Sequence, residues 1–316
     1  FIGGGRIQPW LSVLPNQTRG ANSPVRNAVL RASALAFALP HRAIPLARWV
    51  FPLAHWAIPL AQWVFLLAHS AWRAKTATVT TADFLAANRS SLLQLLTSDY
   101  ELSGELTPLP GEHDANLRLT NGEQSWMVKV GTADCDRELL EMQIAALTHV
   151  AKHERSWNMP EVVLSNAGAG SCEIDTSDGT RPIWVTTWVA GQLFAELPAI
   201  DKRHCTQLGR TLGELATVLA DFSHPKAERQ LKWDLRQSAW IAPHIDAITD
   251  LPLQTVIADV YATFEGILPA LDKLPRSVIH NDANDYNVLV AGLGKVRVFG
   301  LIDFGDMCHT ATIAEV

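Results

Sequence analysis

Two short polar motifs, each next to an apolar strand, constrain the fold of this chain more than any other feature. The stretch from Ser277 to Met307 reads SVIHNDANDYNVLVAGLGKVRVFGLIDFGDM. Its pattern predicts a strand, a polar loop, a strand, a tight Gly-Leu-Gly turn and a further strand that ends in Asp-Phe-Gly-Asp. Because two strands joined by a tight turn form a hairpin, the loops before and after it meet at one end. We therefore expect Asp282, Asn287 and Asp303 to converge.

That convergence suits phosphoryl transfer, in which a protein holds magnesium against nucleotide phosphates and orients an acceptor hydroxyl. Carboxylate and amide oxygens are good magnesium ligands, so we assign Asp303 and Asn287 to the metal. Asp282 is then placed to accept the proton of the acceptor hydroxyl. His280 is expected to brace the loop, and Asp306 either aids a second magnesium or the substrate amine or caps the turn. The alternative is a surface loop rich in Asn and Asp, which turns favour.

The two motifs resemble the catalytic loop of the phosphotransferase family that includes aminoglycoside, choline, fructosamine, homoserine and hydroxylysine kinases. The pattern H-x-D-x-x-x-x-N begins at His280, and the pattern D-F-G begins at Asp303. Their order and spacing, each beside an apolar strand, make the joint signal specific. The ending IDFGDM and the residues Asn281 and Asn284 are similar to the hydroxylysine kinase branch, and residues 231–240 resemble kinase domains fused to class III aminotransferases.

This resemblance implies an α+β fold of the two-lobed, protein-kinase-like type from about residue 82 onward. We expect an N-terminal nucleotide-binding lobe over residues 76–187 and a C-terminal catalytic lobe over residues 188–316, incomplete because the last helices of such kinases should follow. The resemblance also implies Mg²⁺ as cofactor and ATP or GTP as co-substrate.

A lysine for the phosphates is expected upstream, and QSWMVKV offers Lys129 in an apolar strand. Burying an unpaired ammonium is costly, so it needs a partner. In the resembling family a similar L-x-x-Q-x-x-x-L helix carries a pairing glutamate, which makes Glu141 the first candidate and Glu138 the second. The alternative is an edge-strand lysine whose head is solvated.

Two further segments are candidates for nucleotide contacts. The loop PGEHDAN resembles the phosphate loop of these kinases, with backbone amides and Asn116 as the contacts, although a plain hairpin turn is an equal alternative. The strand RPIWVTTWVAG resembles the linker that binds the base through its backbone, at Thr187, Trp188 and Val189. A core strand followed by a turn explains this segment equally well.

Residues 1–75 have a different character. From Ile44 the unit IPLARWV, FPLAHWA, IPLAQWV repeats with a proline in each unit. Proline at this spacing breaks helices, so a coiled coil is not expected. Residues 49–69 carry no Lys, Arg, Asp or Glu and reach the roughly 20 residues of a membrane span, but in-register prolines are poor membrane chemistry. We favour a low-complexity segment that is not a folded domain.

Composition narrows the partners. A formal net charge of -6 gives no reason to expect nucleic-acid binding. The four cysteines form no C-x-x-C pair, and a reducing cytoplasm is the default compartment.

We therefore expect a kinase that transfers the γ-phosphate of ATP or GTP to an alcohol group of a small amine-bearing molecule, with hydroxylysine as the leading acceptor. Homoserine, ethanolamine-like amines and aminoglycosides stay open. The alternative from another class is a non-catalytic, pseudokinase-like nucleotide-binding module that regulates a fused PLP-dependent aminotransferase domain downstream.

Overall fold

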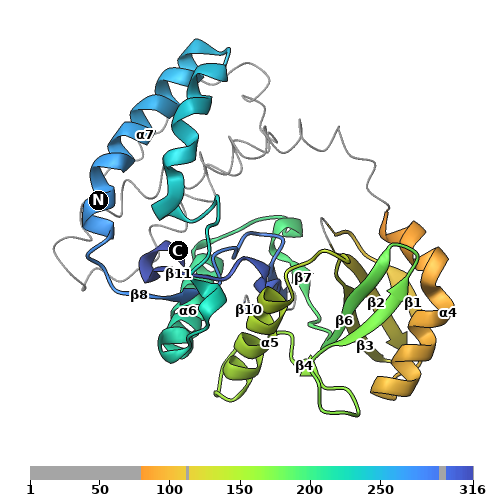
Figure 1. Cartoon of the computed structure of the whole chain (residues 1–316). Helices are drawn as coiled ribbons and strands as arrows, with labels where there is room; N and C mark the ends of the chain where they lie inside the picture. Colours follow the sequence, from red (N-terminus) through yellow and green to blue (C-terminus); the bar gives the residue numbers. More distant parts are fainter. Residues whose placement is uncertain (1–79, 112–113, 292–296, 316) are drawn as a thin grey trace.

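The computed structural model describes residues 80–111, 114–291 and 297–315. The prolyl repeat and the predicted low-complexity segment 1–75 lie outside these residues. The described chain is a mixture of helices and antiparallel strands arranged around two large hydrophobic clusters (Figure 1). The α+β class expected from the sequence is confirmed.

The N-terminal part is built on an antiparallel sheet of six strands (Figure 1). Their order is β1-β2-β3-β6-β4, and β5 also pairs with β6. The strands are β1 (Glu105–Pro108), β2 (Ala115–Asn121), β3 (Gln124–Val130), β4 (Val162–Val163), β5 (Cys172–Thr176) and β6 (Gly179–Thr187).

Helix α4 (Thr81–Tyr100) covers one face of this sheet (Figure 1). It begins where the Thr80 hydroxyl accepts a hydrogen bond from the Asp83 N–H, and it ends at Glu101 in the left-handed conformation. Apolar residues alternate along β2 and β3, so one side of each strand packs under α4. Lys129 lies between the core residues Val128 and Val130 and therefore points to the opposite face, toward the rest of the molecule.

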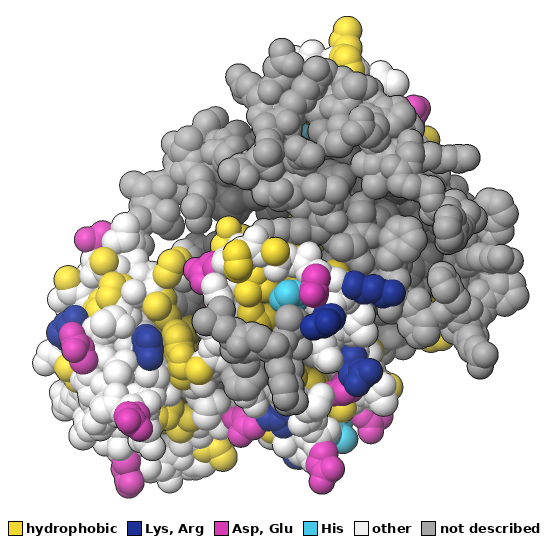
Figure 2. Space-filling model, turned by 180° about the vertical axis from the view of Figure 1, so that it is seen from behind, with side chains coloured by type: hydrophobic (Ala, Val, Ile, Leu, Met, Phe, Trp, Pro, Cys, Tyr) yellow, Lys and Arg dark blue, Asp and Glu magenta, His cyan; other side chains and the backbone are white. Residues whose placement is uncertain are grey.

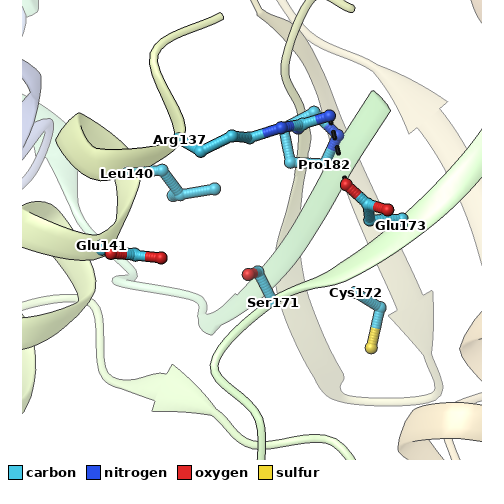
Figure 3. A pocket seen from close by; sticks show the side chains of 7 residues that line it. All are labelled: Arg137, Leu140, Glu141, Ser171, Cys172, Glu173 and Pro182. Atoms are coloured by element: carbon cyan, nitrogen blue, oxygen red, sulfur yellow. Dashed lines mark ion pairs between the residues drawn. The ribbon is translucent and has the colours of Figure 1, made fainter. Parts of the chain in front are cut away.

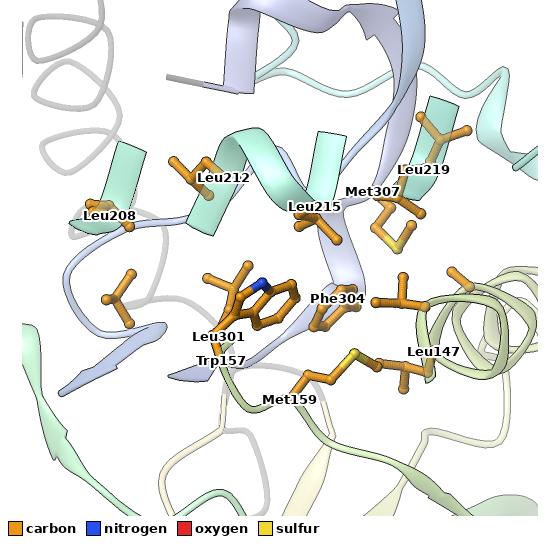
Figure 4. Close-up of a cluster of buried hydrophobic side chains, with 14 of the residues drawn as sticks. Leu147, Trp157, Met159, Leu208, Leu212, Leu215, Leu219, Leu301, Phe304 and Met307 are labelled. Carbon is orange, nitrogen blue, oxygen red and sulfur yellow. The ribbon is translucent and has the colours of Figure 1, made fainter. Parts of the chain in front are cut away.

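Helix α5 (Arg137–Ala151) packs into the core of the C-terminal part. Its buried residues Met142, Ala146, Leu147 and Val150 belong to the cluster that also contains the leucines of α6 (Lys202–Val218), as Figure 4 shows. Side chains at Asp136 and Asp201 cap the two helices by accepting N–H bonds from their first turns. The rotation of α5 about its axis is thus set by the side chains that it buries in this cluster.

Two small sheets complete the C-terminal part. Strands β7 (Gln192–Leu193), β9 (Val288–Ala291) and β10 (Arg297–Leu301) form one in the order β10-β9-β7, and β8 (Arg276–Ile279) pairs with β11 (Cys308–Ala311) in the other. Short 3-10 helices are η2 (Phe194–Glu196), η3 (Leu219–Asp221), η4 (Pro225–Ala227), η6 (Phe304–Asp306) and η7 (Thr312–Glu315). The longer η5 (Leu235–Ala247) lies beside α7 (Leu251–Leu271), away from the sheets (Figure 1).

Within the described residues, no helix combines the length and apolar character needed to cross a bilayer. On the face shown in Figure 2, acidic and basic side chains are interspersed among polar and apolar ones.

Candidate active site

The hairpin β9–β10 brings the two polar motifs together. Val288 pairs with Leu301, and the Ile302 N–H donates to the Asn287 carbonyl over 2.9 Å. This bond extends the ladder by one step, so Asn287 lies opposite the residue that precedes Asp303. The convergence predicted from the hairpin geometry is present.

The carboxylate of Asp282 is held by two amides from its own loop. Asn284 Nδ2 donates to Oδ1 over 2.8 Å, and Asn287 Nδ2 donates to Oδ2 over 2.7 Å and to the Asp282 carbonyl over 2.9 Å. Because both contacts of Asn287 use its nitrogen, its amide oxygen faces away from Asp282. The loop thus fixes a carboxylate in one orientation and leaves an amide oxygen turned elsewhere.

Burial, together with the negative charges of Asp306 and Asp303, raises the pKa of Asp282 to about 7. The two amide donors act in the opposite direction and only partly offset this. A carboxyl group with a pKa near neutrality is well matched to proton transfer at physiological pH.

The ring of His280 connects the loop that carries Asp282 to the residue that precedes Asp303. It is fully buried, its Nε2 lies 3.0 Å from the Ile302 carbonyl, and its Nδ1 lies 3.3 Å from the Asp282 N–H. Burial lowers the pKa of His280 to about 4, so its ring is neutral near pH 7, with Nε2 donating and Nδ1 accepting. The ring also packs edge-on against Phe304. This geometry suits the bracing role expected for His280.

Two residues of these loops have left-handed backbone conformations that non-glycine residues rarely adopt. Asn281 has φ 66°, and Asp303 has φ 62°. Each such conformation costs on the order of 1 kcal/mol and persists only where the surrounding contacts enforce it. Such backbones cluster at functional sites.

Lys129 reaches the site from the N-terminal part. Its Nζ lies 3.5 Å from Asp303 Oδ1. Burial by itself raises the pKa of the Asp303 carboxyl, but its polar and charged neighbours, Lys129 first among them, outweigh burial and lower the pKa below its usual value. Asp303 therefore stays ionised near neutrality, with half of its side chain exposed.

The predicted partner of Lys129 is not the one found. In the described part of the chain Lys129 pairs with Asp303, and neither Glu141 nor Glu138 forms an ion pair with it. Glu141 is exposed because its neighbour Met142 turns into the core, and Glu138 binds Lys226 at 2.8 Å. The expected ion pair between Lys129 and a glutamate of α5 is therefore not formed in the described structure.

Glu141 instead lines a different pocket, of about 220 Å³, between α5 and strands β5 and β6 (Figure 3). Arg137 crosses this pocket and pairs with Glu173 at 3.3 Å. The pocket contains none of Lys129, Asp282 and Asp303, so we do not regard it as the reaction site.

Asn116 shares its sheet face with Lys129. The two residues are directly opposite in β2 and β3, and Trp184 of β6 is opposite Lys129 on the other side. Asn116 Nδ2 donates to the Pro110 carbonyl, while its Oδ1 is buried without a partner among the described residues. The structure thus brings Asn116 beside Lys129, at the base of the loop whose residues 112–113 lie outside the described chain.

The linker residues differ in what they can offer a base. Thr187 is occupied, because its N–H donates to the Glu161 carbonyl and its hydroxyl accepts from the Glu161 N–H. Trp188 lies under the guanidinium of Arg118, 4.5 Å from the ring centre. Val189 packs against Gly300, where an added Cβ would lie 2.5 Å from the valine Cγ1. The contacts found for Trp188 and Val189 involve their side chains, whereas those of Thr187 occupy its N–H and its hydroxyl.

Two residues that support the loops were not anticipated from the sequence. Glu315 is buried and accepts the His280 N–H at 2.6 Å and the Asn281 N–H at 3.4 Å. Arg229 Nη1 donates to the Gly305 carbonyl over 2.8 Å, and Nη2 lies 3.9 Å from Asp306. Both side chains bind backbone atoms of the loops, and since every residue has these atoms, the sequence does not reveal such contacts.

The residues present fit a hard divalent cation. Asp282, Asp303 and Asp306 are close enough for the last two to raise the pKa of the first, which reports a negative potential at this point. No cluster of three or more His, Cys, Asp or Glu side chains with metal-binding geometry occurs in the described residues. The predicted ligand pair, Asp303 and Asn287, would not form such a cluster, because one of its two members is an amide. Two protein ligands are enough for magnesium, which keeps several of its waters.

Comparison with known proteins places this site in a family. The sequence profile of the phosphotransferase enzyme family (APH) matches residues 105–316. The hydroxylysine kinase of Mus musculus is 25% identical over 260 residues, which cover 74% of this chain and 67% of that protein. The homoserine kinase of Xanthobacter autotrophicus is 27% identical over 225 residues, 68% of this chain and 64% of that protein. The chain thus spans about two thirds of the length of these relatives.

Among solved structures, the amicoumacin kinase hAmiN in complex with AMP-PNP, Ca²⁺ and Ami superimposes with a TM-score of 0.50 at 16% identity. The match covers 72% of this chain and 66% of that one, and it supports the fold. Because the family profile matches well over half of the chain and includes all of the loops described above, the chain belongs to the phosphotransferase enzyme family (APH), and it is a phosphotransferase by family.

Proposed function

We propose that this protein transfers the γ-phosphate of ATP or GTP to a hydroxyl of a small amine-bearing molecule, with hydroxylysine as the best candidate acceptor. The observation that carries the proposal is the meeting of Asp282, Asn287 and Asp303 at the end of one hairpin, with Lys129 contacting Asp303 from the other part of the chain. The arrangement supports a two-lobed, kinase-like organisation with the nucleotide between the lobes. Because the chain spans about two thirds of the length of its relatives, the kinase activity of the whole protein is also proposed and not shown.

Each residue has a chemical task in this proposal. Asp282 orients the acceptor hydroxyl and takes its proton, for which a pKa of about 7 is well matched. Lys129 and Asn116, side by side on one sheet face, hold phosphate oxygens, and the backbone of Trp188 and Val189 holds the base. Asp303 and the amide oxygen of Asn287 hold Mg²⁺, which when bound neutralises charge on the phosphates.

The acceptor is proposed from the relatives. Hydroxylysine kinases are similar over about three quarters of this chain, at about 25% identity. Identity at this level leaves the substrate open, so homoserine and other amino alcohols belong in the same screen. A cytoplasmic location and a fused aminotransferase stay predictions from the sequence.

The test is thermal unfolding of the chain with ATP or GTP, with and without Mg²⁺, beside Asp303→Ala. A ligand that binds only the folded state raises its stability, by about 2.7 kcal/mol at 100 times the dissociation constant. We expect a magnesium-dependent shift that Asp303→Ala loses, followed by phosphorylation of hydroxylysine in an acceptor screen. Binding without transfer to any hydroxyl compound would favour the pseudokinase alternative, and no shift with either nucleotide would refute the nucleotide site.

A further inference from the structure

Residues 225–229, which we call the strap, carry three charged side chains that contact three different elements. The strap begins after His224, which caps the short helix η4, and Ala227 fixes it in the main core with 2% of its surface exposed. Lys226 Nζ lies 2.7 Å from Asp136 Oδ2, the residue that caps α5. Glu228 pairs with His309 of β11 and with Arg276 of β8.

Arg229 binds the loop that carries Asp303. Its Nη1 donates to the carbonyl of Gly305 over 2.8 Å. On the other side of the same residue, the Gly305 N–H faces the Asp303 carboxylate and helps to lower its pKa. Gly305 is also so close that a Cβ there would lie 3.2 Å from Asp303 Oδ1. Gly305 is therefore held between Arg229 and the carboxylate of Asp303.

A buried polar network fixes Arg229 in turn. Gln237 Nε2 donates to the Arg229 carbonyl over 3.1 Å and to Asp234 Oδ2 over 3.1 Å. Asp234 is 2% exposed, and its Oδ1 accepts the hydroxyl of Thr310 over 2.7 Å. Satisfied buried networks of this kind rigidify the groups that they hold.

The charge of Arg229 is retained despite partial burial. Burial lowers its pKa, with Asp306 acting in the opposite direction, but an arginine stays protonated in proteins. The planar guanidinium reaches the Gly305 carbonyl with one nitrogen and approaches Asp306 with another. A lysine offers a single point of charge and does not reproduce this fork.

We propose that Arg229 is a positioning residue: by fixing Gly305, it orients the carboxylate of Asp303 toward the metal of the nucleotide complex. The guanidinium of Arg229 contacts the Gly305 carbonyl and lies 3.9 Å from Asp306, so its effect on Asp303 passes through Gly305. The inference rests on the proposed function, in which Asp303 is a magnesium ligand. Groups that orient a metal ligand typically change metal affinity by about 10- to 100-fold when they are replaced.

The experiment compares the whole chain with Arg229→Met, Arg229→Lys and the control Glu228→Gln, which changes the neighbouring residue of the strap without touching Gly305. The measured quantity is the Mg²⁺ concentration that gives half of the nucleotide-dependent thermal stabilisation. We expect both Arg229 variants to need about tenfold more Mg²⁺ or higher, with Glu228→Gln within about twofold of wild type. If Arg229 matters only for stability, its variants will melt at lower temperatures with and without nucleotide, and the half-maximal Mg²⁺ concentration will not change; this result would overturn the inference. An equal rise of the half-maximal Mg²⁺ concentration in Glu228→Gln would overturn it too.

A second readout keeps the inference apart from the proposed function. Hydrogen exchange of the Gly305 amide in the free chain needs no nucleotide, and we expect it to accelerate by about tenfold or more in Arg229→Lys, which retains most of the packing, but not in Glu228→Gln. Unchanged exchange contradicts the positioning role even if the wild type binds no nucleotide. If Arg229→Met does not fold, the lysine variant decides both measurements.

Discussion

The Nζ atom of Lys129 lies 3.5 Å from a carboxylate oxygen of Asp303, and this ion pair joins the six-stranded sheet to the acidic loop of the C-terminal part. With half of the Asp303 side chain exposed, such a pair contributes little to stability. Its importance is geometric, because it places a cation beside Asp303, the carboxylate that we propose as a metal ligand.

The first prediction separates Lys129 from its expected helix partner. We expect Lys129→Met to weaken ATP binding by about tenfold or more, because a charge-assisted contact to phosphate is worth on the order of 1.5–3 kcal/mol. Glu141→Gln should leave affinity within about twofold, since Glu141 faces the separate pocket shown in Figure 3. Isothermal titration with ATP and Mg²⁺ measures both. A loss in Glu141→Gln as large as in Lys129→Met would mean that nucleotide binding reorganises α5 to form the absent ion pair.

The second prediction concerns Asp282. Asp282→Asn should reduce phosphoryl transfer by about 10² to 10⁴, the usual contribution of a general base, and leave nucleotide affinity nearly unchanged. Single-turnover phosphorylation and nucleotide titration are the measurements, with Asp285→Asn in the same loop as the control. Equal transfer by wild type and Asp282→Asn would refute the assigned role.

The sequence was sufficient for some of these relationships and insufficient for others, for physical reasons. Asp282, Asn287 and Asp303 could be placed together because a hairpin joins its own ends, whatever the rest of the chain does. The partner of Lys129 could not, because the direction of Glu141 depends on how α5 is rotated when Met142 enters the main core cluster, which brings together segments far apart in sequence.

The supporting residues were beyond sequence reasoning for a second reason. Arg229 and Glu315 bind a backbone carbonyl and backbone amides, groups that every residue carries. Thr187 reads like a linker contact in the sequence, but its groups are taken by Glu161, which comes from a preceding loop. The elements could therefore be predicted more completely than the contacts between them.

The third prediction follows from the negative neighbours of Asp282. Burial comes first among the causes that raise its pKa to about 7, and the Asp306 charge adds to it. Asp306→Asn removes that charge, so the pKa of Asp282 should fall. Asp285→Asn removes a charge from the loop of Asp282 itself and serves as the control, because Asp285 is not among the groups that raise this pKa. Carbon-detected NMR titration of the carboxyl groups in the nucleotide-free chain measures this directly. An unchanged or higher pKa of Asp282 in Asp306→Asn contradicts the electrostatic coupling.

The fourth prediction links Glu315 to stability. Burial raises the pKa of Glu315 to about 8, although its hydrogen bonds from the His280 and Asn281 N–H groups act in the opposite direction. Between its ordinary pKa and about 8 the folded chain binds more protons at this site than the unfolded chain does. Stability must therefore fall as pH rises through this window, with a slope of up to about 1.4 kcal/mol per pH unit for one group.

Glu315→Gln keeps an oxygen that can accept the His280 N–H but cannot ionise, so it should flatten the pH dependence. The effect should be clearest between about pH 7 and 8, above the titration of Asp282, which contributes a similar fall at lower pH. Chemical denaturation at a series of pH values gives the free energy of unfolding, and Glu105→Gln, at an exposed position of β1, controls for the loss of a surface charge. If wild type and Glu315→Gln show the same slope above pH 7, Glu315 does not titrate in this range, which contradicts the raised pKa.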